Sequence, residues 1–299
     1  MPGGPQGALE RLLWRRPNLV VSLQLSPSLA WLTFFFLAPL VLIVVYSVSR
    51  RAEGGGVLLG FTLQHYTRIL SSNYYLGITW QSLVLGLKVT ALTLLISYPV
   101  AYLLATTRSR WKPFLVFLLV VPWWTSILVK NFAWVGILLD NGLANRFLLW
   151  TGLTHRPVKL LYNEFSVVVG LIHVLIPFMT LPLFATLEKM EPQLLEAAEN
   201  LGAGPLRAFR EVTLPLSMPG VASGCILTFI LAFGSYVTPA LLGGPKNWMV
   251  AMVVQDQFLN AFNWPFGSAV AIVLLAIVMA LVLVFNRLVG LEKIWGEVR

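Results

Sequence analysis

This 299-residue sequence is short of charge and almost free of cysteine. Asp, Glu, Lys and Arg together make up 11% of it, whereas 58% is hydrophobic and the mean hydropathy is +0.80. An average soluble domain carries roughly 25% charged residues, so the composition excludes a soluble globular protein. The single cysteine, Cys225, excludes an internal disulfide, and its apolar neighbours in sequence indicate a packed side chain.

The motifs of common nucleotide-binding and metal-binding proteins are also missing. No stretch fits the P-loop pattern G-x-x-x-x-G-K-[ST], so the chain cannot bind ATP in the usual way. There is no HExxH and no paired cysteine motif, and the three histidines lie far apart. We therefore expect no catalytic residue, no cofactor and no metal ion in this chain. The net charge of +9 does not require nucleic acid as a partner, because basic residues at membrane boundaries explain it.

Long apolar runs are what the sequence does contain. Several reach the roughly 18 residues that a spanning helix needs, so we expect an all-α membrane protein with six transmembrane helices. The expected spans are Leu29–Val48, Gly77–Ala105, Pro113–Val129, Phe165–Leu187, Leu214–Leu242 and Gly267–Phe285. Lys88 is the only Lys or Arg well inside these spans. Burying an ammonium group in hydrocarbon is costly, so Lys88 is expected at a subunit interface, in a polar cavity or snorkelling outward.

The remaining segments divide the chain into four parts. Residues 1–27 are expected to form a cytoplasmic segment with a short surface helix. A signal peptide is the alternative, but the apolar run that follows is too long for the apolar region of a signal peptide and lacks a cleavage site. Residues 28–76 hold the first span and an outer loop with a short amphipathic helix at Phe61–Leu70. Residues 77–288 form a core of five transmembrane helices, with a long outer connection at Lys130–Glu164 that includes a surface helix. Residues 289–299 are a cytoplasmic tail. The tight basic loop of Arg108, Arg110 and Lys112 places both termini in the cytoplasm.

The longest polar interruption of the second half lies within the loop 188–215. Its chemistry predicts two short helices with a sharp turn. Pro192 suits a first helical turn, and Gly202 stands where a helix end favours a left-handed residue. Gly204 and Pro205 turn the chain into the second helix, and Pro215 restarts it toward the next span.

The spacing within this loop resembles the cytoplasmic loop motif of ABC importer permeases. Glu196, Ala197 and Ala198 are followed at the family's intervals by Gly202, then by Val212, Leu214 and Pro215; the one departure is Val212, where Ile is usual. In that family the loop inserts a short helix into a groove of a separate ATPase subunit, which is helix-in-groove recognition. The resemblance implies that these seven residues couple the permease to the ATPase.

Beyond the loop, nearly the whole chain resembles the first permease subunit of the spermidine/putrescine ABC importer family. The segments that carry this are VPWWTSILVKNFAW (121–134), DNGLANRFLLWTGL (140–153), IPFMTLPLFATLEKM (176–190), LLGGPKN (241–247) and QFLNAFNWPFGSA (257–269). The resemblance implies a type I importer fold in a bacterial inner membrane. It also implies a second, similar permease, two ATPases that bind ATP and Mg, an external solute-binding protein, and a polyamine or another small organic solute.

The solute path is less clearly marked than the loop. Carboxylates and aromatic faces suit a cationic solute, yet the segment FGSYVTPALLGG before the GGPKN turn has no carboxylate. The candidate path residues are Lys88, Trp123, Trp124, Asp140, Tyr236 and Asp256, with Glu164 as a further outer-side carboxylate. Interfacial anchoring is the alternative for the two tryptophans.

Two other classes of protein remain as alternatives. A secondary transporter working alone would have a pair of interrupted helices at matching positions in two halves, and the sequence has no clear pair of this kind. A membrane enzyme would need a catalytic motif, and none is present.

Overall fold

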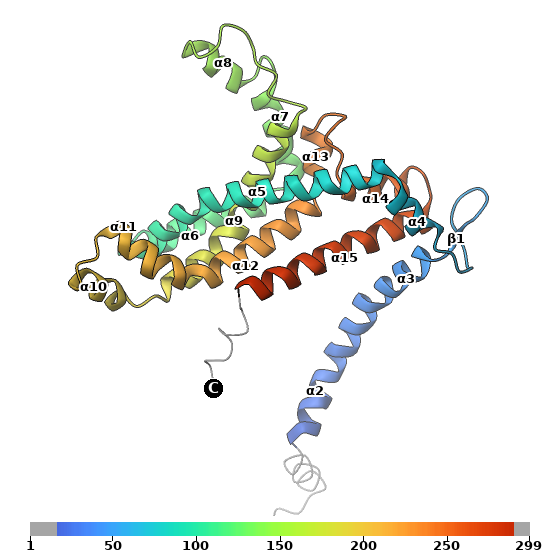
Figure 1. The fold of residues 1–299 in the computed structure, drawn as a ribbon, viewed down its shortest axis with the longest axis horizontal. Helices are drawn as coiled ribbons and strands as arrows, with labels where there is room; N and C mark the ends of the chain where they lie inside the picture. Colours follow the sequence, from blue (N-terminus) through green and yellow to red (C-terminus); the bar gives the residue numbers. More distant parts are fainter. Residues whose placement is uncertain (1–16, 290–299) are drawn as a thin grey trace, which may run out of the picture.

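The computed structural model describes residues 17–289 as a set of apolar helices (Figure 1). The chain begins with α2 (Pro17–Leu32), a π-helical turn η1 (Thr33–Leu37) and α3 (Ala38–Ser47). A hairpin of β1 (Arg50–Arg51) and β2 (Val57–Leu58) follows. The later helices are α4 (Gln64–Ser71), α5 (Asn73–Thr106), α6 (Lys112–Val120), the 3₁₀ turn η2 (Val121–Trp124), α7 (Ile127–Leu138), α8 (Leu143–Trp150), α9 (Glu164–Glu188), α10 (Pro192–Asn200), α11 (Pro205–Ala208), the π turn η3 (Phe209–Thr213), α12 (Leu214–Phe233), α13 (Val237–Leu242), α14 (Val250–Leu259) and α15 (Trp264–Val289).

The body of the molecule is a bundle in which α5, α9 and α12 lie side by side, with α15 along one flank (Figure 1). Glycines let α9 and α12 approach closely. A Cβ added at Gly220 would lie 2.7 Å from Thr186 Oγ1, and one added at Gly224 would lie 2.9 Å from Met179 Sδ. Small residues four apart are the usual means of close packing between membrane helices, where apolar side chains gain little by leaving lipid.

Six helical stretches are long and apolar enough to cross a membrane. Those at Gln24–Ser47, Asn73–Thr106, Glu164–Glu188 and Trp264–Phe285 confirm the predicted first, second, fourth and sixth spans, with ends that differ by a few residues. The amphipathic helix predicted at Phe61–Leu70 is also present, as α4. Apolar length and helical periodicity therefore located most of the spans.

The predicted third span, Pro113–Val129, is wrong as one continuous helix. Pro122 lies in the run, and the chain becomes extended at Thr125 before Ser126 caps a new helix through its hydroxyl group. The apolar stretch of spanning length is instead Ile127–Trp150, which holds α7 and α8. Lys130 and Arg146, expected in an outer connection, lie inside this stretch, so Lys88 is not the only basic residue within a span.

The predicted fifth span, Leu214–Leu242, ends early. Helix α12 stops at Phe233, and α13 begins only at Val237. Pro239 explains the break, because a proline ring crowds the carbonyl four residues before it, here that of Ser235. The spanning stretch begins instead at Pro205, within the polar loop. The helix α14, which follows α13, was not predicted at all.

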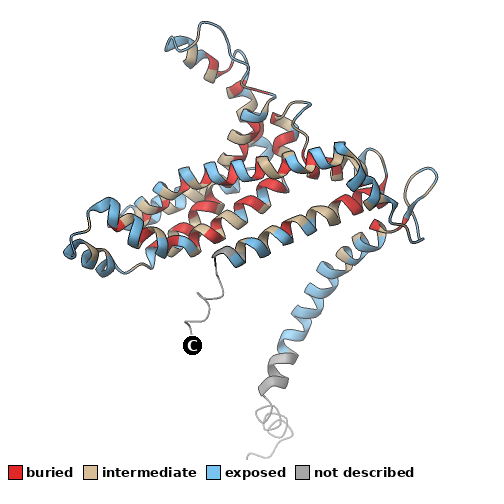
Figure 2. Cartoon of the chain, in the orientation of Figure 1, coloured by how far each residue is buried: buried red, intermediate tan, exposed pale blue. Residues whose placement is uncertain are grey.

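Two parts of the chain stand away from the bundle. Helix α2 projects from it with all its described side chains exposed, whereas α3 packs against α15. Helix α7 leads to α8 in the opposite direction (Figures 1 and 2). Trp31, Phe34 and Phe36 are each 66% exposed. Such apolar surface must face lipid or another protein. The surface helix predicted within residues 1–27 lies largely outside the described residues, as does the tail from residue 290.

Candidate functional site

The loop between α9 and α12 carries the residues predicted to couple the chain to an ATPase. Glu196, Ala197 and Ala198 lie on α10, which begins at Pro192 as predicted. Gly202 ends the helix with a φ of +84°, which confirms the predicted left-handed residue. The backbone N–H of Gly202 donates to the Glu199 carbonyl at 2.9 Å, and that of Ala203 donates to the Ala198 carbonyl at 3.0 Å. This pair of bonds is a Schellman cap, which fixes the direction in which the chain leaves α10.

The second half of the loop differs from the prediction. Pro205 opens α11, but the helix does not stop before Pro215; it continues through η3 into α12. A proline inside an α-helix crowds the carbonyl four residues earlier, and for Pro215 that residue is Glu211, within the wider π turn. The first helix shows the same arrangement, with η1 before Pro39. The π turn thus lets one rigid helix run from the loop into the bundle.

The loop exposes apolar side chains at its tip. Leu201 is 89% exposed, Leu206 is 80% exposed and Leu194 is 43% exposed. Glu196 and Ala197 are exposed as well, while Ala198, Val212 and Leu214 are half-buried and Pro215 is exposed. Exposed leucines on a short polar loop are suited to insertion into a groove of a partner protein.

Aromatic and polar contacts tie the loop to the bundle. The Phe209 ring meets the Tyr98 and Tyr102 rings of α5 edge to face, with centroids 5.6 and 6.3 Å apart. The Tyr98 hydroxyl lies 2.9 Å from Ser217 Oγ of α12. The loop is therefore in contact with α5, which in turn contacts α12.

A second tie holds α6 and α9 together beside this loop. Lys112 Nζ lies 3.0 Å from Glu188 Oε1, at the end of α9, and donates to the Ala105 carbonyl at 3.1 Å. The Lys112 side chain is only 22% exposed. The last turn of α9 is thereby anchored to the end of α5.

The six residues predicted along a solute path do not meet in one pocket. Trp123 packs edge to face on Phe178 at 5.0 Å, while Trp124 is 76% exposed. Asp140 lies exposed in the turn after α7, and Tyr236 is 44% exposed at the break before α13. Asp256, on α14, accepts hydrogen bonds from Asn260 and Gln257.

Lys88 is the one of the six that lines a polar cavity. Its Nζ lies 2.6 Å from Glu164 Oε1, and the cavity of about 210 Å³ is also lined by Trp80 and Gln81. Sequence analysis missed these last two residues. Their signal was present, because Gln81, Val84 and Lys88 have the spacing of one helix face.

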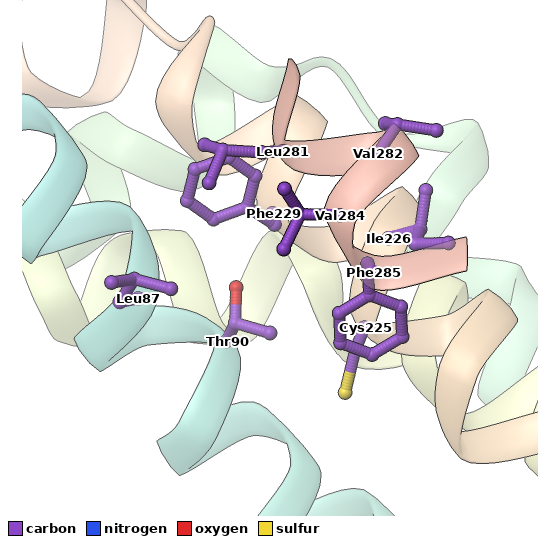
Figure 3. Close-up of a pocket in the computed structure, with 9 residues that line it drawn as sticks. All are labelled: Leu87, Thr90, Cys225, Ile226, Phe229, Leu281, Val282, Val284 and Phe285. Atoms are coloured by element: carbon purple, nitrogen blue, oxygen red, sulfur yellow. The ribbon is translucent and has the colours of Figure 1, made fainter. Parts of the chain in front are cut away.

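A second cavity, of about 130 Å³, lies among α5, α12 and α15 (Figure 3). Its lining is almost wholly apolar: Leu87, Ile226, Phe229, Leu281, Val282, Val284 and Phe285, with Thr90 and Cys225. Because a polar or charged solute would lose its hydration here without gaining partners, this cavity does not suit one.

His173 is a packed residue. Its Nδ1 accepts a hydrogen bond from Trp134 Nε1 at 2.8 Å, joining α9 to α7. Next to this pair, Asn131 Nδ2 donates to Thr238 Oγ1 at 3.1 Å. The first contact holds α7 against α9, and the second holds α13 against α7.

Comparison with known proteins adds three findings. Residues 94–291 match the family described as binding-protein-dependent transport system inner membrane component. The chain is 37% identical over 257 residues to the spermidine/putrescine transport system permease protein PotB of Escherichia coli K12, covering 86% of this chain and 93% of that one. It is 24% identical to the permease protein PotC of the same organism, over 87% of this chain and 90% of that one.

Among solved structures, the fold resembles that of a chain in a bacterial alginate ABC transporter, crystallised with an alginate-bound periplasmic protein. The TM-score is 0.72 at 18% identity, and the match covers 93% of this chain and 95% of that one. At this identity, the likeness concerns the fold alone.

Proposed function

The chain belongs to the family of binding-protein-dependent transport system inner membrane components, and from that premise we propose that it moves a polyamine, spermidine or putrescine, into the cytoplasm. Its six apolar helices make it a multi-pass permease subunit of an ABC importer. The polyamine is the finer step, and it rests on one observation: 37% identity to PotB along nearly the full length of both chains.

A different small organic solute carried by the same machinery is the second candidate. The segment FGSYVTPALLGG, which spans the break between α12 and α13, holds no carboxylate. The lack of a carboxylate there favours a solute of lower positive charge.

The proposed complex contains four kinds of protein. This chain pairs with a second, related permease, and its greater identity to PotB than to PotC supports two different permeases in one complex. Two ATPase subunits hold ATP and Mg, because this sequence has no P-loop. An external binding protein delivers the solute, as the family description implies.

The loop at Glu196 to Pro215 is the proposed docking site for one ATPase. Helix α10 enters a groove with Glu196, Ala197 and Ala198, and the cap at Gly202 sets its angle. Val212, Leu214 and Pro215 lie in the continuous helix that leads from this loop into the bundle. That continuity supports a coupling role, because a rigid helix transmits movement without bending.

Transport measurements test the polyamine assignment. The complex, reconstituted into liposomes with ATP inside and loaded binding protein outside, is expected to import radiolabelled spermidine or putrescine. A complex whose ATPase lacks its P-loop lysine is the control for ATP dependence. Import of an uncharged or anionic solute, with no import of either polyamine, would contradict the assignment and favour the second candidate.

A further inference from the structure

The ion pair of Lys88 and Glu164 is an unusual feature of the apolar bundle. Lys88 lies near the middle of the 34-residue α5, and Glu164 is the first residue of α9. Their charged atoms are 2.6 Å apart, yet the two side chains remain 52% and 48% exposed. Charges in hydrocarbon are costly, so this exposed side of the pair must face water or the partner permease rather than lipid.

The backbone that carries Glu164 is held in a fixed place. The preceding Asn163 forms a capping box with Ser166, and Ser166 Oγ donates to the Leu242 carbonyl at 2.7 Å. The first turn of α9 is thereby locked to α13. A negative charge at this position is also stabilised by the helix dipole. Glu164 is therefore a preorganised anionic group on a rigid helix end.

The cavity beside this carboxylate has the chemistry of an ammonium site. Trp80 is 67% exposed and presents an indole ring, and Gln81 presents an amide. Gln81 Nε2 donates to the Lys246 carbonyl at 2.6 Å, which fastens the loop after α13 to the cavity. Val84 and Leu85 give an apolar wall. A carboxylate, an aromatic face and an aliphatic wall match an alkylammonium group and the methylenes next to it.

The ammonium group of Lys88 already occupies the position in which an ammonium group of a solute would bind the Glu164 carboxylate. Within residues 17–289, its Nζ forms a hydrogen bond or ion pair with Glu164 only. Lys112, in the other interhelical pair, differs: it is more buried and has a second hydrogen bond, to Ala105. The Lys112 pair is suited to a fixed anchor, whereas the ammonium group of Lys88 can be exchanged for another ammonium group at Glu164.

We propose that Glu164 binds one ammonium group of the solute and that Lys88 occupies this carboxylate when no solute is present. The proposal rests on the proposed import of an organic cation. Exchange of one ammonium group for another keeps the carboxylate neutralised throughout, so the empty site holds no unpaired carboxylate. The ammonium group of Lys88, whose side chain is 52% exposed, is hydrated when the solute displaces it. Trp80 then stacks on the bound group, and Gln81 keeps the neighbouring loop in place.

Equilibrium dialysis measures this site apart from transport. The purified complex of both permeases and both ATPases, without binding protein, is dialysed against radiolabelled putrescine and spermidine. Glu164→Gln is expected to weaken binding about tenfold or more, because a charge-assisted hydrogen bond is lost. Lys88→Met is expected to strengthen binding, because the competing ammonium group is gone. Glu53→Gln, in the exposed turn of the β1–β2 hairpin, is the matched control and keeps wild-type affinity.

The double variant Lys88→Met with Glu164→Gln guards against a purely structural effect. It leaves no unpaired charge, so it is expected to assemble in normal yield and still to bind solute as weakly as Glu164→Gln alone. Wild-type affinity in Glu164→Gln or in the double variant would overturn the proposal. So would weaker binding in Lys88→Met, or no binding to the wild-type complex. None of these results bears on whether the complex with its binding protein imports a polyamine, which the uptake assay decides.

Discussion

Gly202 shows how one residue can set the geometry of a docking loop. Its φ of +84° is a conformation that costs other residues about 1–2 kcal/mol, although a Cβ placed there would meet nothing within 4 Å. The restriction is thus in the backbone and not in packing. A side chain at this position would favour a different exit from α10 and would change the direction in which the exposed Leu201 points.

Gly202→Asp is therefore expected to leave the membrane helices inserted but to weaken ATPase association or uncouple ATP hydrolysis from uptake. The measurements are recovery of the complex, ATPase activity stimulated by the loaded binding protein, and solute uptake, all in one preparation. Gly204→Ala is the matched control, because Gly204 has a φ of −69° and open space around it. Normal values of all three quantities in Gly202→Asp would remove the coupling role from this loop.

At the scale of elements, the pairing of α9 with α12 is the contact on which the bundle depends. Gly220 and Gly224 bring α12 against Pro182, Thr186 and Met179 of α9. Helix α12 begins in the loop, so its packing against α9 decides whether a displacement of the loop moves α12 alone or the whole bundle. Backbone atoms on the facing side cannot move away as a flexible side chain can.

Gly224→Val is expected to destabilise the protein by about 1–3 kcal/mol, because an added Cβ would lie 3.0 Å from the Met179 carbonyl oxygen. The check is a lower midpoint of thermal unfolding in detergent. Gly136→Ala, on α7 with open space around it, should unfold like the wild type. An unchanged midpoint in Gly224→Val would show that the two helices can separate without cost.

At the scale of the whole molecule, the expected topology has both termini in the cytoplasm. The tight loop of Arg108, Arg110 and Lys112 supports this, because basic loops stay on the cytoplasmic side. The docking loop then lies on the same side, where ATP is available. In this expected topology, the hairpin at Gly55, which follows α3, is on the outer side of the membrane.

A reporter fused after Arg299 is expected to show a cytoplasmic position, and one inserted at Gly55 is expected to show an external position. Alkaline phosphatase and green fluorescent protein at the two sites give opposite readouts, so each site carries its own control. The reverse pattern at both sites would place the docking loop outside the cell, where no ATPase could reach it.

The sequence by itself determined the class of the protein, four of the six spans and the shape of the docking helix. These follow from local physics: apolar length fixes a span, and Pro192 and Gly202 fix the two ends of α10. The continuation of α11 into α12 could not be read in the same way. Pro215 is a helix breaker by local rules, yet here a π turn precedes it and the helix continues.

Tertiary structure alone decided how the interrupted helices pack and which charges meet. The apolar runs at residues 113–129 and 214–242 are long enough to span. The chain breaks after η2 in the first run and after α12 in the second, and α7 and α13 then pack together against α9. Glu164 stands 76 residues from Lys88, and no local pattern joins them. Hydropathy counts how much apolar surface a segment carries, whereas the pairing of distant charges depends on which helix faces meet, and that is settled only when the bundle forms.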